Sequence, residues 1–277
     1  MKLVTFRRHG AAFTQVGAVE GSEVKVLASY PDMIAALDAG VPKLQRSAST
    51  ASSVPLAEVE LLAPIARPSK LICIGLNYRD HAIESNMAMP KIPTVFCKFP
   101  TAIVGPGAAV VLPAISTQPD YEAEFAFVIG KGGRRIQGAD WQDHVIGYTI
   151  INDVSARDVQ LATSQWMIGK NFDTFSPMGP YITTADEIAD PHVLNISLTL
   201  NGETLQNSNT RELIFKIPEL IEHLSSILTL ETGDIVSTGT PAGVGFARKP
   251  PIYLKAGDEM VVRVEGLGEL RNPVVGE

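Results

Sequence analysis

The sequence predicts an α+β protein in which strands outnumber helices. Runs of alternating apolar and polar residues, the pattern of a half-buried strand, recur along the chain and do not alternate regularly with helical segments. Asn201-Gly202, which follows the alternating residues Ile196, Leu198 and Leu200, is a strong signal for a hairpin turn. This order of elements favours an α+β fold over a doubly wound parallel sheet.

Two units are expected, a small N-terminal α/β domain over residues 1–66 and a larger domain over residues 67–277. The small unit should contain strands near Leu3–Phe6, Phe13–Gly17 and Glu23–Val26, a helical patch near Met33–Leu37, and a Ser- and Ala-rich linker at Arg46–Val54. Strands of the larger unit are predicted at Lys70–Ile74, Thr94–Lys98, Tyr121–Ile129, Val145–Asp153, Asn195–Leu200, Asp234–Ser237 and Glu259–Val264. One helix is expected from about Ser155 to Trp166. Another should begin near Pro218, because proline suits a first helical turn and apolar residues recur behind it at helical spacing.

Composition and charge exclude several classes of protein. The chain has 277 residues, 45% hydrophobic and 19% charged, which is ordinary for a soluble globular protein. A net charge of −7 argues against a nucleic-acid partner, because phosphate binding needs a basic surface. No apolar run approaches the ~20 residues that span a bilayer, and the first residues lack the apolar core of a signal peptide. With only Cys73 and Cys97, both expected to be reduced, the sequence predicts a cytoplasmic protein.

Glu122 and Glu124 form the most informative pair of residues. They alternate with Tyr121, Ala123 and Phe125 in a predicted strand, so both carboxylates point to the same side. Their Cα atoms should lie roughly 6.5–7 Å apart. Carboxylates held that close repel each other unless a cation lies between them. The alternative is a solvated outer face that carries two acids by chance.

Asp153, at the end of the next apolar strand, offers a third carboxylate. It could instead cap the helix that follows, since Ser155 and Asp158 resemble a capping box. Together with Glu122 and Glu124 it completes an all-oxygen set. Such a set suits Mg²⁺, with Mn²⁺ or Ca²⁺ as substitutes, and does not suit zinc. Three protein ligands leave coordination positions open for water or substrate.

Basic and polar residues that follow Asp153 could hold an acidic substrate. Arg157 and Gln160 are three residues apart on a predicted helix and therefore share a face. Lys170 lies in a loop rich in turn formers and could stabilise a developing oxyanion. The backbone amides and the Thr240 hydroxyl of the glycine-rich turn at 237–245 could hold a carboxylate. A solvated helix face and a surface lysine are the plainer alternatives.

His81 and Glu84 are the candidates for proton transfer. At a spacing of three residues on a helical turn, the carboxylate can orient the imidazole and raise its basicity, as a general base requires. Exposed helices also carry such pairs without any function. The segment 85–93, with two Met and two Pro residues, is either a mobile lid over the substrate or a surface loop.

Taken together, five motifs in order resemble the fumarylacetoacetate hydrolase superfamily, in its short domain-containing form, over residues 68–277. The motifs are Gly75-Leu76-Asn77-Tyr78…His81…Glu84, Glu122-Ala123-Glu124, Asn152-Asp153-Val154-Ser155-Ala156-Arg157-Asp158, Gly169-Lys170…Asp173…Pro177…Gly179-Pro180, and Ser237-Thr238-Gly239-Thr240-Pro241. The resemblance implies a mixed β-roll, barrel-like catalytic domain and a homodimer. It also implies Mg²⁺ held at the positions of Glu122, Glu124 and Asp153.

The resemblance assigns further roles. His81 and Glu84 would form a water-activating dyad on a closing lid, and Lys170 would lie beside the metal. The substrate, a small dicarboxylate or keto acid, would contact Tyr78, Arg157, Gln160 and Thr240.

The activity expected first is Mg²⁺-dependent hydrolysis of the C–C bond of acylpyruvates, or 2,4-dioxo acids, to pyruvate and a carboxylic acid. The dyad would activate water, and Lys170 with the metal would stabilise the departing pyruvate enolate. The same enolate chemistry supports two alternatives: isomerisation of 2-hydroxy-diene-dioates of the 5-carboxymethyl-2-hydroxymuconate type, and decarboxylation of oxaloacetate. A different class, an inactive metal- or ligand-binding scaffold, would have no use for the dyad.

Overall fold

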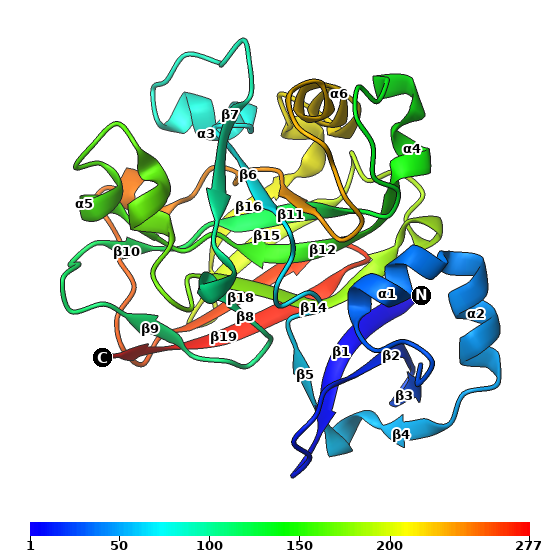
Figure 1. Cartoon of the computed structure of the whole chain (residues 1–277). Coiled ribbons are helices and arrows are strands. Elements are labelled where there is room, and N and C mark those ends of the chain that lie inside the picture. The colour runs from blue at the N-terminus through cyan, green and yellow to red at the C-terminus, as the bar shows by residue number, and fades with distance from the viewer.

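The structure is a computed structural model that describes residues 1–277 (Figure 1). Its largest element is a 12-stranded sheet. Along its main path lie β4 (Ser53–Pro55), β3 (Glu23–Val26), β2 (Gln15–Glu20), β1 (Lys2–Arg8), β14 (Ser176–Thr184), β12 (Val145–Asn152), β11 (Ala123–Ile129), β17 (Ile235–Ser237), β6 (Leu71–Gly75) and β7 (Thr94–Lys98). Off this path, β5 (Val59–Leu62) pairs with β1 and β8 (Ile103–Val104) pairs with β14. Most neighbours are antiparallel, whereas β17 and β6 run parallel.

Two smaller sheets complete the β structure. The five-stranded sheet has the order β16 (Glu203–Asn209), β15 (Asn195–Leu200), β18 (Glu259–Val264), β19 (Gly268–Gly276) and β9 (Val110–Leu112). A two-stranded sheet joins β10 (Pro119–Asp120) to β13 (Ser155–Ala156). The hairpin turn expected between β15 and β16 is present, with Asn201 at φ 52° and Gly202 at φ 84°. Positive φ at both positions is what a type I′ turn requires.

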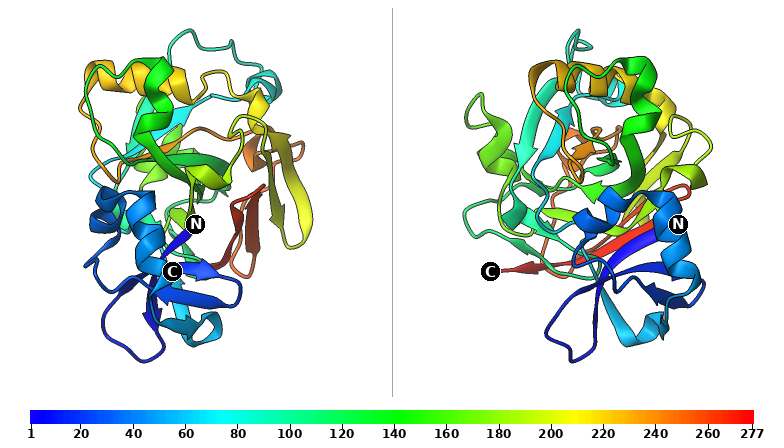
Figure 2. Two further views of the ribbon diagram at one scale, coloured as in Figure 1. Left: turned by 90° about the vertical axis from the view of Figure 1, so that its right-hand side faces the viewer. Right: turned by 45° about the vertical axis from the view of Figure 1, so that its right-hand side comes forward.

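Six α-helices lie on the outside of these sheets (Figures 1 and 2). They are α1 (Met33–Ala39), α2 (Val41–Ser49), α3 (Arg79–Glu84), α4 (Trp141–His144), α5 (Arg157–Gln160) and α6 (Ile217–Ile227). The helix predicted near Pro218 is α6, and it buries Leu220, Ile221 and Leu224 in the core. None of the helices has the length and apolar character needed to cross a membrane.

The β11 strand lies between two hydrophobic cores and is buried along its whole length. Phe125 and Phe127 belong to a cluster of 35 buried residues shared with the five-stranded sheet and α6. Ala126 and Val128, on the opposite face, belong to a second cluster of 21 residues. The predicted alternation of side chains along this strand is therefore present, but the residues on both of its faces are buried.

The N-terminal residues are joined to the rest of the molecule by this second core and by the large sheet. Leu3 of β1 pairs with Ile182 of β14, which continues the sheet across the boundary expected near residue 66. Leu37 and Leu44, from the two N-terminal helices, lie in the same cluster as Ala126 of β11. The N-terminal part forms one end of the molecule in all the views (Figures 1 and 2).

The α+β class is confirmed, whereas two local predictions are wrong. The linker expected at Arg46–Val54 is the end of α2 followed by β4, because Leu44 and Ala48, four residues apart on α2, are both buried. The helix expected from Ser155 to Trp166 is a single turn, α5. The Thr163 hydroxyl both donates to the Gln165 carbonyl and accepts from its N–H, and this local turn competes with a continuing helix.

Candidate active site

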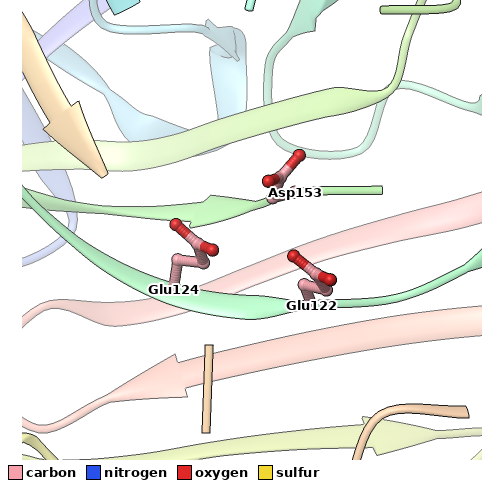
Figure 3. A group of neighbouring side chains, drawn as sticks. All are labelled: Glu122, Glu124 and Asp153. Atoms are coloured by element: carbon pink, nitrogen blue, oxygen red, sulfur yellow. The ribbon is translucent and has the colours of Figure 1, made fainter. Parts of the chain in front are cut away.

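Three carboxylates from two neighbouring strands converge on one point (Figure 3). Glu122 directly precedes β11, Glu124 lies within β11, and Asp153 directly follows β12. The antiparallel register pairs Ala123 with Asn152, so the end of β12 lies beside the start of β11. One carboxylate oxygen from each acid lies within 4.8 Å of the others. The convergence of these acids, expected from the sequence, is therefore present.

Burial decides between the alternatives for these acids. The exposed fractions are 6% for Glu122, 2% for Glu124 and 0% for Asp153, which excludes a solvated face. Asp153 does not cap the following helix either, because Ala156 occupies the N-cap of α5 and no side chain caps it. Unpaired buried charges are costly, so each carboxylate must find donors or cations.

Three buried cations supply part of that compensation. Lys170 Nζ lies 2.9 Å from Glu122 Oε2 and 2.8 Å from Asp153 Oδ2. Lys98 Nζ lies 2.6 Å from Asp153 Oδ1, and Arg157 Nη1 lies 2.7 Å from Glu122 Oε1. Burial lowers the pKa of Lys170, but the charges of Asp153 and Glu122 outweigh it and leave this pKa above its usual value. The two carboxylates therefore favour the charged form of Lys170.

Glu124 is the acid without a cationic partner. Its Oε2 atom accepts hydrogen bonds from Ser237 Oγ at 2.5 Å and from the Gly239 N–H at 3.1 Å. Burial, followed by the charges of Asp153 and Glu122, raises the pKa of Glu124 well above its usual value. A divalent cation between the three carboxylates would relieve this repulsion. The residues present thus fit a divalent metal with a preference for oxygen ligands.

His81 and Glu84 face each other on α3. His81 Nδ1 lies 3.4 Å from Glu84 Oε2, near the outer limit of a hydrogen bond. The Gly243 N–H also donates to the Glu84 carboxylate, at 2.9 and 3.1 Å from its two oxygens. Glu84 is therefore anchored to the glycine-rich turn while it orients the imidazole. The exposed fraction of His81 is 8%.

A cavity of about 180 Å³ opens beside this cluster. Its lining includes seven of the ten residues predicted for the site: His81, Glu122, Glu124, Arg157, Gln160, Lys170 and Thr240. Asp153 belongs to the carboxylate cluster without lining the cavity, and Glu84 reaches it through His81. The structure does not place Tyr78 with them, because its side chain is fully buried in the larger hydrophobic core and its hydroxyl has no hydrogen-bond partner.

Arg157 is held in place on three sides. Its Nε donates to Asp120 Oδ2 at 2.8 Å, its Nη1 donates to Gln160 Oε1 at 3.0 Å, and the Phe246 ring lies 4.5 Å from its guanidinium carbon. Its Nη2 is buried and has no partner. A rigid guanidinium with a free donor in a cavity is suited to an anionic ligand.

Thr240 has a structural contact as well as its place in the cavity lining. Its hydroxyl accepts a hydrogen bond from Gln206 Nε2 at 2.8 Å, which fixes the turn after β17 against β16. The turn expected to carry ligand-binding groups therefore lies at the site.

Sequence reasoning missed four residues that shape the site: Lys98, Asp120, Phe96 and Trp166. Lys98 ends β7 and looks like a solvated strand residue, while Asp120 ends the two-residue strand β10 just before the glutamate pair. A signal was present for Asp120, since a third acid next to Glu122 and Glu124 needs a partner. Phe96 and Trp166 enter the cavity lining only through tertiary packing.

This fold and this cluster of buried acids place the chain in a known class. The chain belongs to the fumarylacetoacetate hydrolase family, because the family described as "Fumarylacetoacetate (FAA) hydrolase C-terminal" matches residues 70–275.

Individual relatives share most of the chain. It is 44% identical over 288 residues to "Oxaloacetate tautomerase fahd2, mitochondrial" from Xenopus laevis, which covers 99% of this chain and 90% of the relative. The crystal structure of a 5-carboxymethyl-2-hydroxymuconate delta-isomerase from Mycobacterium smegmatis is 38% identical with a TM-score of 0.84, covering 100% of both chains.

A third relative was solved with ligands. It is the maleylpyruvate hydrolase from Sphingobium sp. SYK-6 in complex with manganese (II) ion and pyruvate. It is 31% identical with a TM-score of 0.84 and covers 100% of this chain and 99% of that one. The family thus contains hydrolases, isomerases and tautomerases, and at least one member binds a divalent metal.

The comparisons correct the expected location. The relative from Xenopus laevis and those from Bos taurus and Homo sapiens carry the word mitochondrial in their names, which contradicts the prediction of a cytoplasmic protein. Reduced cysteines, on which that prediction rested, are equally compatible with other reducing compartments.

Proposed function

We propose that this protein is a Mg²⁺-dependent tautomerase that interconverts the keto and enol forms of oxaloacetate or a closely related 2-keto diacid. The observation that carries the proposal is a single cavity lined by both a glutamate pair suited to a metal and a glutamate-oriented histidine. Tautomerisation needs only a charged site for an enolate and one group that moves a proton. The relative that matches 99% of the chain is named for this reaction, which favours it over C–C hydrolysis.

Glu122, Glu124 and Asp153 would hold the metal. When bound, Mg²⁺ supplies the positive charge that polarises a keto oxygen and lowers the cost of an enolate. Mn²⁺ would substitute, because it accepts the same oxygen ligands.

The other residues have separable roles. Arg157 binds a substrate carboxylate through its free Nη2, and Gln160 and Thr240 contribute polar contacts beside it. Lys170, whose charged form Asp153 and Glu122 favour, would stabilise the enolate oxygen. Since Glu84 faces Nδ1 of His81, the other nitrogen, Nε2, is the one that moves the proton. It takes the proton from C3 of the keto form and returns it to the enol oxygen, so no atom is gained or lost.

Hydrolysis of an acylpyruvate is the second candidate. The same His81–Glu84 pair could activate water instead of taking a carbon-bound proton. A neighbour named maleylpyruvate hydrolase was solved with manganese and pyruvate, which supports this candidate.

One experiment separates these reactions. Enol-oxaloacetate is offered to the protein with Mg²⁺, and its ultraviolet absorbance and the pyruvate formed are followed together. A tautomerase accelerates the loss of absorbance without pyruvate, whereas a decarboxylase yields pyruvate and CO₂. An acylpyruvate panel provides the second arm, because a hydrolase releases pyruvate plus a second acid. Unchanged decay of the enol would refute the proposal.

The protein is also proposed to act as a homodimer. The β7 strand is the last strand of the large sheet, and Val95 and Phe99 on or next to it are each 42% exposed. Ile168, in the segment that packs against β7, is 64% exposed. Apolar side chains beside an open sheet edge are typical of protein–protein contacts. Light scattering of the purified chain would show twice the 29.7 kDa protomer mass, and a monomer would refute this part.

A further inference from the structure

The cavity lining combines two kinds of side chain, here called its charged half and its apolar half, although Phe96 and Phe246 pack directly on Lys170 and Arg157. Glu122, Glu124, Lys170 and Arg157 make up the charged half, which the proposed function assigns to the keto-acid end of the substrate. The remainder is largely apolar and consists mainly of Ile74, Leu76, Met87, Phe96, Leu161, Trp166 and Phe246. Since the reaction takes place at the charged half, the apolar half faces whatever the substrate carries beyond the reacting carbons.

Trp166 reaches into this half over a glycine. A Cβ atom placed on Gly75 would lie 2.4 Å from Cζ3 of Trp166 and 3.2 Å from its Cη2 atom. Carbon atoms do not approach that closely, so the indole ring can occupy this position only because residue 75 has no side chain. The indole ring also packs against Phe96, with the ring centroids 6.1 Å apart and an interplanar angle of 74°.

The segment that carries Trp166 is fixed to the ligand-binding helix. A Cβ atom on Gly169 would lie 2.4 Å from the backbone nitrogen of Gln160, so this segment packs directly on α5. Lys170 in turn lies 5.1 Å above the Phe96 ring. Direct contacts therefore fix the position of the aromatic pair relative to the charged half, and the cavity that both line measures about 180 Å³.

We propose that Trp166, seated on Gly75, is a specificity-determining residue that limits the substrate to short 2-keto acids. This inference rests on the proposed function for the orientation of the substrate. A pocket wall discriminates through the groups that it excludes, at about 10- to 200-fold for each methylene-sized group. Trp166 would thus exclude 2-keto acids with a bulky group beyond the reacting carbons.

Binding measured by calorimetry with Mn²⁺ tests the wall without any turnover. Oxalate reports on the charged half alone, and N-benzyloxamate presents a carboxylate beside an amide carbonyl, a related chelating head, with a bulky tail. The wild-type protein should bind oxalate at least tenfold more tightly. In Trp166→Ala the affinity for N-benzyloxamate should rise at least tenfold, while that for oxalate should change less than twofold. A ratio of the two affinities that is the same in Trp166→Ala as in the wild type would overturn the proposal.

Gly75→Ala tests whether the packing of the Trp166 ring on Gly75 fixes the position of the ring. Trp166 must move off residue 75, so the affinity ratio should shift in the same direction as in Trp166→Ala. In the double variant, Gly75→Ala should add nothing, because the ring that it displaces is gone. Additive effects of the two substitutions would show that Gly75 acts through something other than Trp166.

Fluorescence gives an independent readout of the same movement. The chain has two tryptophans, and the other, Trp141, packs against His192 outside the cavity. In a Trp141→Phe background only Trp166 emits, and Gly75→Ala should shift its emission to longer wavelength as the ring gains exposure. An unshifted emission would contradict the packing argument. If enol-oxaloacetate is not a substrate but the affinity ratio shifts as described, the proposed function is refuted while the role of Trp166 in limiting ligand size is supported.

Discussion

Lys98 Nζ lies 2.6 Å from Oδ1 of Asp153, and neither side chain is exposed to solvent. Lys98 also donates to the Val154 carbonyl at 3.1 Å, so it fixes the backbone that follows β12. The other oxygen of Asp153 faces Lys170. The Lys98 ammonium thus orients the Asp153 carboxylate from the side of β7. The Lys170 ammonium bridges the carboxylates of Asp153 and Glu122.

Replacing Lys98 with Met should strongly destabilise the protein. The substitution leaves Asp153 with a buried charge that has lost one partner, and removing one member of a buried ion pair costs about 3–5 kcal/mol. Urea unfolding measures this loss. The exposed Lys43 provides a matched control, since Lys43→Met should change the free energy of unfolding by less than about 0.5 kcal/mol. Equal stabilities of the two variants would show that the Lys98 contact is not structural.

Glu124→Gln should weaken metal binding with little loss of stability. The amide keeps the volume of the side chain and can still accept from Ser237 and Gly239, but it removes the negative charge. We expect Mn²⁺ affinity to fall at least tenfold, which corresponds to about 1.4 kcal/mol. Calorimetric titration measures the affinity, with Glu58→Gln at an exposed position as the control. Mn²⁺ binding that matches the wild type would remove Glu124 from the ligand set.

His81→Ala should abolish turnover and spare the metal site. Loss of a general acid–base group typically lowers the rate by about 10²–10⁴-fold. Because His81 is not part of the carboxylate cluster, Mn²⁺ affinity should stay within twofold of the wild type. The exposed His9 serves as a control, since His9→Ala should leave the rate unchanged. A rate that survives in His81→Ala would assign the proton transfer to another group.

Acid should destabilise the protein partly through His192. Its Nε2 atom accepts from the Ile217 N–H at 3.3 Å, at the start of α6, and therefore has to be unprotonated. Burial lowers the pKa of His192 below its usual 6.5, against the opposing charge of Asp190. The unfolded chain then binds more protons than the folded one near this pH. Stability consequently falls as the pH drops through 6.5, and this loss levels off below the folded-state pKa.

His192→Gln offers the comparison for this effect, because the glutamine oxygen can still accept a hydrogen bond but does not titrate. Urea midpoints of both proteins at about pH 7.5 and about pH 5 give the difference. The wild type should lose more stability on acidification than the variant. Parallel losses would show that His192 contributes nothing to the pH dependence.

The sequence predicted best what depends on neighbours along the chain. Strand limits at Thr94–Lys98, Asn195–Leu200 and Glu259–Val264 agree with the structure, because alternation and turn residues are local signals. The convergence of Glu122, Glu124 and Asp153 was also predictable, since alternation sets the side on which the glutamates lie and both strands end near the same place.

What escaped prediction depends on contacts between distant segments. Lys98 meets Asp153, 55 positions later in the chain, and Asp120 meets the Gly245 N–H, 125 positions later. Tyr78 differs from the other predicted residues for the opposite reason. Its motif lies next to the site, yet its side chain turns into the hydrophobic core. The single turn of α5 was missed because Arg157 and Gln160 alone fit a longer helix equally well.

The pairing of β1 with β14 makes the N-terminal segment a structural support for the carboxylate cluster. From β1, two strand neighbours lead through β14 to β12, whose last residue precedes Asp153. Trimming the segment would bare an inner edge of the sheet and open the shared core beneath β11. Substitutions on the inward face of this segment are therefore expected to disturb the carboxylate cluster more than substitutions in its outer loops.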